Sequence, residues 1–325
     1  MDLLLLILIF ILAVVLIVKG GKFVVEVGAL LGDYTGINEA LIGATLTSLA
    51  TTFPELILTI LGMSQNTTSL VVGNSFGTIL VNICLVLGAS LSFLSLKRIN
   101  KSTLSKIIFV TILTALMVLL LSFNILNVYS GILLIVVFFS YFVSTFLDMK
   151  KDLIRKGKIN KEKVLENKDI SLNQKLSYIL KFVVGTLIIF AGAQLLVNAV
   201  KEISFKLNIS QTLIGLIAVS ISTSLPELVT SVTSIRKKRI NLAIGNVVGA
   251  NIINLTLLLG LAGIFSGASG INLTNIEKSV LLPSILIASI IFALPVYLKK
   301  RTYKWQGITL LSLYTIYCII IILTI

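Results

Sequence analysis

The sequence predicts an all-α polytopic membrane protein in which ten transmembrane helices form two inverted repeats of five helices each. The first supporting observation is composition: of 325 residues, 57% are hydrophobic and 12% are charged, with a mean hydropathy of +1.07. A water-soluble domain needs more polar side chains on its surface, so the solvent around this chain is lipid. The second observation is a block of sequence that recurs 172 residues later, and the third is the gathering of basic residues in alternate loops.

The transmembrane helices are predicted from apolar runs of about twenty residues or more, which is the length that crosses a bilayer. The start of the chain, Met1-Asp2, lacks the basic segment of a signal peptide, so we expect the first run to be a membrane span. Glu26 follows Lys22 by one helical turn, and we expect these two residues to pair. The predicted spans are 3–31, 39–64, 69–95, 103–123, 127–147, 176–201, 211–234, 241–265, 276–298 and 304–325.

The orientation in the membrane is predicted from the loops. Those that follow odd-numbered spans hold nearly all the lysines and arginines, as in Arg236-Lys237-Lys238-Arg239 after the seventh span. Short basic loops stay in the cytoplasm, so we expect both termini to face the outside of the cell membrane. The basic residues that give the chain its net charge of +14 lie mostly in loops after odd-numbered spans. This distribution indicates membrane topology rather than a nucleic-acid partner.

One long polar interval divides the chain. Residues 149–175 are rich in lysine, with a few acidic residues among them. We expect this interval to be a solvated, partly helical cytoplasmic linker between a first repeat at 1–148 and a second at 176–325.

The two halves match without a gap between residues 43–88 and 215–260. An odd number of spans in each half places the two copies in opposite orientations, around a two-fold axis in the membrane plane. The matched residues are Gly43, Ser48, Thr51, Pro54, Glu55, Gly73, Asn74, Gly77, Asn82 and Gly88, which correspond to Gly215, Ser220, Thr223, Pro226, Glu227, Gly245, Asn246, Gly249, Asn254 and Gly260.

Glu55 and Glu227 are the two acidic residues that fall deep within predicted spans, where a charged group is costly and usually functional. Each follows a proline, which removes a backbone hydrogen bond and should distort the helix and free a carbonyl group. Two ionised carboxylates near one axis repel each other unless a cation lies between them. The residues therefore predict a cation site at the membrane midplane, and the alternative is a pair of neutral, hydrogen-bonded acids.

Two further elements accompany each glutamate. The motifs Gly73-Asn74-x-x-Gly77 and Gly245-Asn246-x-x-Gly249 open the third and eighth spans, and glycines four residues apart let helices approach closely. Two turns further on lie Asn82 and Asn254, whose amides can offer oxygen to an ion or donate to a glutamate.

These paired blocks resemble the repeats of the cation/Ca²⁺ antiporter superfamily, particularly the Na⁺/Ca²⁺ exchangers of archaea and bacteria. The resemblance covers both repeats and the ten-span plan. It implies that Glu55 and Glu227 bind Ca²⁺ together with backbone oxygens of Thr51 and Thr223, and that the first and sixth spans slide to alternate access. The side chains that it implies for Na⁺ are Ser48, Thr52, Thr78, Ser220 and Ser224, with Asn82 and Asn254 in support.

The expected function is therefore transport rather than catalysis: a monomer that exchanges Ca²⁺ for Na⁺ across the cell membrane, without a cofactor. The sequence has no G-x-x-x-x-G-K-[ST] loop for ATP, so an ion gradient should drive it. The position of the family's serine is Thr78 in the first half but Ala250 in the second, which leaves the counter-ion open. The alternatives are H⁺/Ca²⁺ exchange by the same carboxylates, a passive cation channel and a membrane scaffold that does not transport.

Overall fold

A computed structural model of the protein describes residues 3–35, 37–64, 68–93, 99, 101–159, 172–208 and 214–324, and every regular element within them is helical. In this part of the chain nine helices are long and apolar enough to cross a membrane, and a pair of helices bent by 46° provides a tenth span. These ten spans overlap the ten predicted runs. The predicted fold class is confirmed.

The first repeat contains two π-helical turns, labelled η, within its second and third spans. Such turns are rare and often mark functional positions in a helix. The elements are α1 (Leu3–Thr35), α2 (Glu39–Ile42), η1 (Gly43–Thr47), α3 (Ser48–Ser64), α4 (Thr68–Val81), η2 (Asn82–Leu87), α5 (Gly88–Phe93), α6 (Lys101–Ser122) and α7 (Val128–Ile159).

The second repeat has π-helical turns at the equivalent positions, η3 and η4. The two repeats therefore share the local distortions of their helices as well as their sequence motifs. A further π-turn, η6, and a short 3₁₀ turn, η5, belong to this repeat alone within the described residues. The elements are α8 (Leu172–Lys206), η3 (Ile214–Val219), α10 (Ser220–Thr223), α11 (Leu225–Arg236), α12 (Ile240–Ile253), η4 (Asn254–Leu258), α13 (Leu259–Phe265), η5 (Gly267–Ser269), η6 (Glu277–Leu281), α14 (Leu282–Lys299) and α15 (Lys304–Thr324).

The contacts between the two inverted repeats come in crossed pairs. Helix α5 packs against α15, and the equivalent α13 packs against α7. In the same way η1 lies against α12, while η3 lies against α4. Each repeat therefore packs into the other, and the glutamate-bearing helices lie at the centre of the arrangement.

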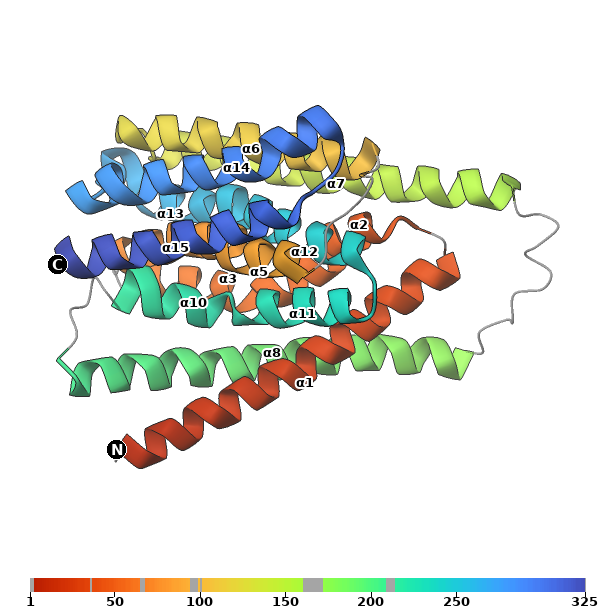
Figure 1. Ribbon diagram of the computed structural model, residues 1–325, viewed down its shortest axis with the longest axis horizontal. Coiled ribbons are helices and arrows are strands. Elements are labelled where there is room, and N and C mark those ends of the chain that lie inside the picture. The colour runs from red at the N-terminus through yellow and green to blue at the C-terminus, as the bar shows by residue number, and fades with distance from the viewer. Residues whose placement is uncertain are drawn as a thin grey trace.

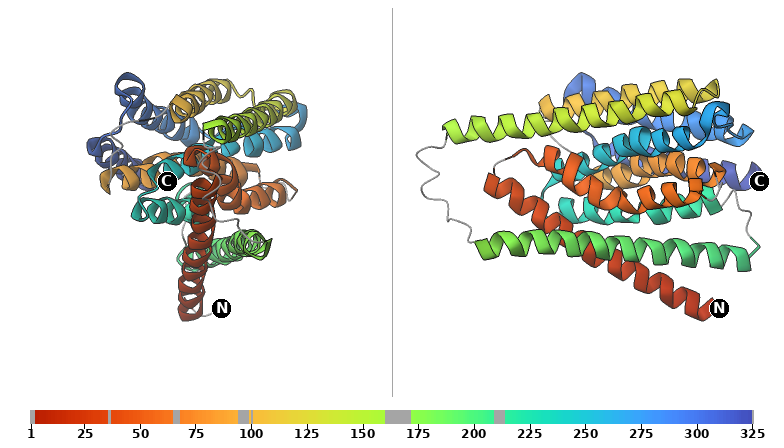
Figure 2. Two further views of the ribbon diagram at one scale, coloured as in Figure 1. Left: turned by 90° about the vertical axis from the view of Figure 1, so that its right-hand side faces the viewer. Right: turned by 180° about the vertical axis from the view of Figure 1, so that it is seen from behind.

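Helices α1 and α8 pack extensively against each other and lie to one side of the remaining bundle (Figure 2). The expected pairing of Glu26 with Lys22 is wrong. Glu26 instead forms an ion pair with Lys181 of α8, at 3.1 Å. The close approach of the two helices brings this lysine within reach of Glu26, so a contact between helices replaces one within a turn.

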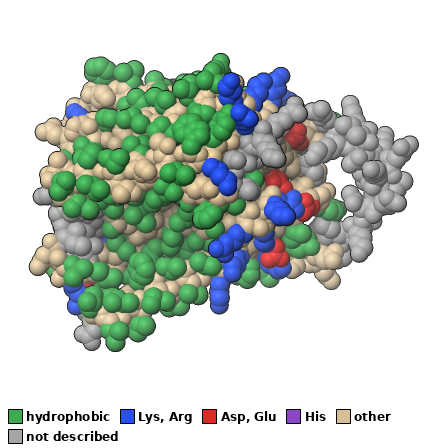
Figure 3. All heavy atoms as spheres, in the orientation of Figure 1, with side chains coloured by type: hydrophobic (Ala, Val, Ile, Leu, Met, Phe, Trp, Pro, Cys, Tyr) green, Lys and Arg blue, Asp and Glu red, His purple; other side chains and the backbone are tan. Residues whose placement is uncertain are grey.

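The two chain ends lie at one end of the bundle, whereas the end of α7 and the start of α8 lie at the other (Figure 1). Helix α7 extends to Ile159 and α8 begins at Leu172, so both ends of the predicted linker are helical; residues 160–171 lie outside the described residues. Lysine and arginine side chains gather near this end, whereas the rest of the visible surface is largely hydrophobic (Figure 3).

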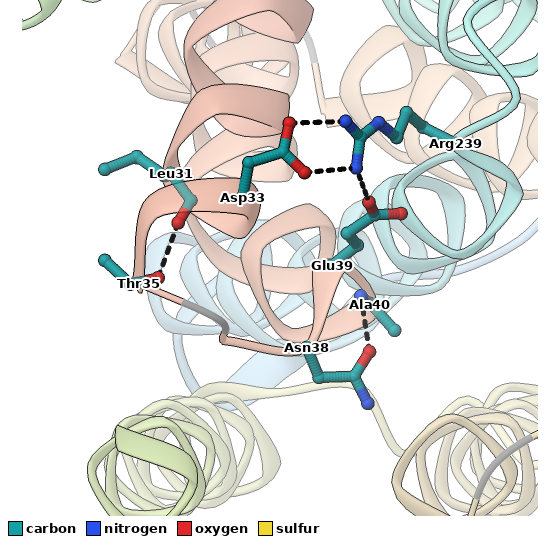
Figure 4. A network of polar contacts seen from close by, with 7 residues as sticks. All are labelled: Leu31, Asp33, Thr35, Asn38, Glu39, Ala40 and Arg239. Carbon is teal, nitrogen blue, oxygen red and sulfur yellow. Dashed lines mark hydrogen bonds and ion pairs between the residues drawn. The ribbon is translucent and has the colours of Figure 1, made fainter. Parts of the chain in front are cut away.

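A charged cluster joins three helices at the basic end. The guanidinium group of Arg239, which precedes α12, donates to both carboxylate oxygens of Asp33 at 2.7 and 2.5 Å (Figure 4). It also donates to Glu39 Oε1 at 2.5 Å. These hydrogen bonds to Asp33 and Glu39 raise the pKa of Arg239 above its usual value. The cluster ties the end of α1 to the starts of α2 and α12.

Candidate cation site

The two glutamates lie on helices that cross the centre of the bundle, and the local structure around them differs between the repeats. Glu55 lies within α3, which continues from Ser48 to Ser64 with Pro54 inside it. Glu227 lies in the first turn of α11, after a break at Ser224. The prediction that both prolines distort the helix is right for the second repeat, whereas in the first repeat the distortion lies earlier, at η1.

All eleven residues that the sequence singled out as site residues are buried. Each is at most 1% exposed, and so little exposure is unusual for polar side chains unless they are satisfied by partners or by an ion. They are Ser48, Thr51, Thr52, Glu55, Thr78, Asn82, Ser220, Thr223, Ser224, Glu227 and Asn254.

Two hydrogen bonds connect the repeats in a crossed manner. The hydroxyl of Thr51 donates to Asn246 Oδ1 at 3.3 Å, and the equivalent Thr223 donates to Asn74 Oδ1 at 3.2 Å. Each bond joins the threonine before one glutamate to the asparagine of the G-N-x-x-G motif in the other repeat. Each threonine turn is thereby held against the G-N-x-x-G helix of the opposite repeat.

The second glycine of each G-N-x-x-G motif allows this close approach. A Cβ atom on Gly249 would lie 2.6 Å from Ser48 Oγ, and one on Gly77 would overlap Ser220 Oγ. Only glycine leaves space for the serine of the opposite repeat. The hydroxyl of Ser48 donates to the carbonyl of Thr45 at 3.1 Å, within its own helix.

The carboxylates have few partners among the described residues. Glu227 Oε1 accepts a hydrogen bond from Thr52 at 3.2 Å, but Glu227 Oε2 and both carboxylate oxygens of Glu55 have none. Two further buried oxygens, Asn82 Oδ1 and Asn254 Oδ1, are without a hydrogen bond in the described structure.

These unpaired oxygens lie on elements that touch across the two-fold axis. Helix α3, with Glu55, contacts η4, which begins at Asn254. Helix α11, with Glu227, contacts η2, which begins at Asn82. The unpaired atoms are oxygens of carboxylates and amides, and such hard donors suit Ca²⁺ and Na⁺. No group of three or more His, Cys, Asp or Glu side chains occurs among the described residues, so the other ligands would come from hydroxyl, amide and backbone oxygens.

The symmetry of the site is broken beside the threonines. The hydroxyls of Thr78 and Thr223 lie 3.2 Å apart, whereas the residue equivalent to Thr78 is Ala250, which has no hydroxyl. A second departure is Asn251, whose Oδ1 accepts from Asn82 Nδ2 at 3.0 Å and whose equivalent is Ile79. Asn254 instead donates to the carbonyl of Ala250, at 3.0 Å.

Several polar residues of this region were not singled out by the sequence. Asn251 and Thr230 have no polar counterpart in the other repeat, so the search for matched residues passed over them. Thr59 and Ser231, by contrast, match at the same offset and lie one turn beyond each glutamate. Both are fully buried with unpaired hydroxyls in the described structure, and their spacing from the glutamates could have identified them.

Comparisons with known proteins agree with this architecture. The chain is 27% identical to an uncharacterised membrane protein of Methanocaldococcus jannaschii, over 94% of this chain and 95% of the relative. It is 26% identical to the sodium/calcium exchanger MaX1 of Methanosarcina acetivorans, over 97% of each protein. Its fold matches the solved structure of the sodium-calcium exchanger NCX_Mj with a TM-score of 0.80, at 23% identity, over 97% of this chain and 98% of that chain.

The family comparison covers both repeats. Residues 5–147 and 177–323 match the family described as sodium/calcium exchanger protein, and these two segments make up most of the chain. The resemblance inferred from the proline-glutamate and G-N-x-x-G motifs is therefore confirmed, and the chain belongs to the sodium/calcium exchanger protein family.

Proposed function

We propose that the protein exchanges Ca²⁺ for Na⁺ across the cell membrane by alternating access, with a midplane site built on Glu55 and Glu227. Family membership supports the class of cation/Ca²⁺ exchanger, and the sodium/calcium exchanger MaX1 is similar over nearly its whole length. The observation that carries the assignment of the site is the set of buried oxygens without hydrogen-bond partners, on elements of both repeats that contact one another.

A cation explains these oxygens better than a neutral pair of acids does. A buried carboxyl group that is not hydrogen-bonded is costly in either protonation state, and three of the four glutamate oxygens have no described partner. Ca²⁺ takes six to eight oxygen ligands and removes the repulsion between two carboxylates. In this proposal Glu55 and Glu227 bind Ca²⁺, with backbone oxygens of Thr51 and Thr223 beside them.

Sodium would occupy sites that overlap the Ca²⁺ site, so that the two ions bind in turn. The hydroxyls of Ser48, Thr52, Thr78, Ser220 and Ser224 would contribute to these sites, and Asn82 and Asn254 would support them. Ser224 marks the break between α10 and α11, and its hydroxyl is buried without a partner among the described residues. The hydroxyls of Thr52 and Thr78 already point to Glu227 and Thr223.

Occupancy by cations would also control the change of access. An empty site contains two charged carboxylates, and the cost of dehydrating these charges prevents the site from changing access. A site loaded with cations is neutralised, so this cost is removed. Helices α1 and α8 would slide past the bundle because they pack mainly against each other and lie at its side. The basic end, with the connection between α7 and α8, would face the cytoplasm, and both termini would face outward.

The proposal is tested by Ca²⁺ uptake into proteoliposomes that contain the purified protein. An outward Na⁺ gradient should drive uptake, and an outward proton gradient or no gradient should not. Uptake driven by protons alone would instead support H⁺/Ca²⁺ exchange. The missing hydroxyl at Ala250 mildly favours this alternative, whereas the lining rich in serine and threonine favours sodium. Uptake that needs no counter-ion at all would support a channel.

The site is tested by Glu55→Gln and Glu227→Gln, each of which should abolish Ca²⁺ flux because it removes one charged ligand. Glu26→Gln is the matched control, since Glu26 lies on α1 and pairs with Lys181 at the protein surface. Full uptake in either Glu55→Gln or Glu227→Gln would exclude the assigned site.

A further inference from the structure

A cavity lies between α6 and α7, and it is lined by residues other than those of the cation site. Its volume is about 400 Å³, which is within the range of small-molecule sites. The lining consists of three serines, two aromatic rings, a valine, a lysine and an aspartate, and these residues are Ser105, Lys106, Phe109, Val137, Ser140, Tyr141, Ser144 and Asp148.

Lys106 is the central feature of this cavity. It is only 7% exposed, although lysine is rarely buried in proteins. Its ammonium group donates to Thr145 Oγ1 at 2.9 Å and lies over the ring of Tyr141, 5.0 Å from the centroid. The ring of Tyr141 in turn stacks on Phe109, so the lysine is held in a fixed position by α7.

The positive charge of Lys106 has no ion-pair partner within the described residues. Asp148 lines the same cavity and its charge attracts Lys106, but its ion pair is with Lys151 on its own helix, at 4.0 Å. An ammonium group has three donors, and Thr145 accepts one of them. The cavity thus offers a buried cation and the hydroxyls of three serines, which together can bind a group with several anionic oxygens, such as a phosphate.

The cavity opens toward lipid rather than toward bulk water. Ser140 and Ser144 are exposed and lie on one face of α7, and Val136 and Val143 on the same stretch of helix are 54% and 56% exposed. These apolar side chains face the acyl chains. Lys106 lies five residues after the first residue of α6, roughly 7 Å along the axis. That is the level at which a lipid headgroup meets the acyl chains.

The rim of the cavity has further charges suited to a headgroup. Lys101, Lys150 and Lys151 are exposed near this end of α6 and α7. Basic residues at the end of a transmembrane helix attract anionic lipids, and basic pockets between such helices bind their headgroups. We propose that the cavity between α6 and α7 binds the headgroup phosphate of a membrane phospholipid, with Lys106 as its cation and Ser105, Ser140 and Ser144 as its hydroxyl donors.

Native mass spectrometry of the full-length, delipidated protein tests this site with phosphatidylglycerol as the probe. The wild-type protein should retain one tightly bound lipid. Lys106→Met should weaken its binding at least tenfold. Ser144→Leu should have a similar effect, because it fills the cavity without removing the contact between Lys106 and Thr145. Lys304→Gln is the control, since it removes one positive charge from the start of α15, outside the cavity lining and its rim, and it should change binding less than twofold.

Two further arms distinguish the source of the phosphate. Diacylglycerol with the same acyl chains should not be retained, and inorganic phosphate should not displace the lipid. Retention of diacylglycerol would overturn the proposal in favour of an apolar groove, and displacement by phosphate would overturn it in favour of a free-anion site. Equal retention of phosphatidylglycerol by Lys106→Met, Ser144→Leu and the wild type would overturn it outright.

Discussion

The hydroxyl oxygens of Thr78 and Thr223 lie 3.2 Å apart, and the two-fold relation that makes the rest of the site symmetric does not reproduce this contact. The equivalent of Thr223 is Thr51, and the equivalent of Thr78 is Ala250. One half of the site therefore has a pair of hydroxyls and the other has a single hydroxyl. If the hydroxyls bind Na⁺ and the glutamates bind Ca²⁺, this asymmetry should affect sodium alone.

Thr78→Ala is expected to raise the Na⁺ concentration for half-maximal exchange by about five- to tenfold, because one ligand hydroxyl contributes about 1 kcal/mol. Ala250→Ser should lower that concentration, since it adds a hydroxyl on the other side of the axis. The measurement is Ca²⁺ uptake into proteoliposomes as a function of internal Na⁺. Thr78→Ser, which keeps the oxygen, is the control. A Thr78→Ala protein with normal Na⁺ dependence and impaired Ca²⁺ affinity would contradict the assignment of Thr78 to sodium.

The two motif asparagines are expected to differ in their contribution to stability. Asn246 accepts from Thr51 and also donates to Thr230 at 2.9 Å, whereas Asn74 accepts from Thr223 and its amide nitrogen has no partner in the described structure. Asn246→Ala should therefore reduce the free energy of unfolding by about 1 kcal/mol more than Asn74→Ala does.

Thermal unfolding in detergent checks this comparison. Both variants remove the same buried volume at equivalent positions, so the cavity term largely cancels and the extra hydrogen bond remains. A melting temperature of Asn74→Ala at or below that of Asn246→Ala would show that the bond to Thr230 contributes nothing to stability.

The sequence predicts the spans and the burial of the glutamates because both depend on local composition. An apolar run such as 276–298 can form all its backbone hydrogen bonds in lipid only as a helix. The correspondence of Glu55 with Glu227 is visible directly in the sequence. The partner of Glu26 is not predicted, because Lys181 becomes its neighbour only after α1 and α8 pack together. An argument from helical spacing considers only residues within one helix, so it cannot find a partner on another helix.

The two prolines illustrate the same limit within the site. Pro54 and Pro226 have nearly the same local sequence, yet one lies inside a continuous helix and the other at the start of a new one. The local sequence therefore does not decide between these outcomes. Asn251 was missed for another reason: a search for repeated residues cannot find a residue that only one repeat possesses, and Asn251 bonds to Asn82 across the repeats.

Gly249 and Gly77 are expected to tolerate no side chain. A Cβ atom added to either glycine would lie closer than van der Waals distance to a serine of the opposite repeat. Gly249→Ala should cost about 1–3 kcal/mol of stability through overpacking, or prevent folding altogether. Gly28→Ala is the matched control, since its Cβ would lie 3.4 Å from Thr47 Oγ1, an ordinary contact. Size-exclusion chromatography and thermal unfolding measure both variants, and Gly77→Ala should behave as Gly249→Ala does. Equal stability of Gly28→Ala and Gly249→Ala would show that the helices can separate without cost.

Arg239 is expected to stabilise the basic end of the protein through its three hydrogen bonds to Asp33 and Glu39. Its side chain is 28% exposed and that of Glu39 is 19% exposed, so water screens the cluster only in part. Arg239→Gln should reduce the free energy of unfolding by about 1 kcal/mol at low salt, and by less at high salt, because ions screen exposed charges. Arg239→Lys should not restore the loss, since an ammonium group cannot bind a carboxylate through two parallel hydrogen bonds.

Lys151→Gln provides the comparison that isolates the geometry of this cluster. Lys151 also pairs with an acidic residue, Asp148, but at 4.0 Å and with the lysine side chain 78% exposed, so its removal should leave the melting temperature unchanged. Both substitutions remove one positive charge from the same end of the protein. A shared loss of stability would therefore point to the overall charge of that end, whereas a loss confined to Arg239→Gln would trace it to the bidentate contact that joins α1 to α12.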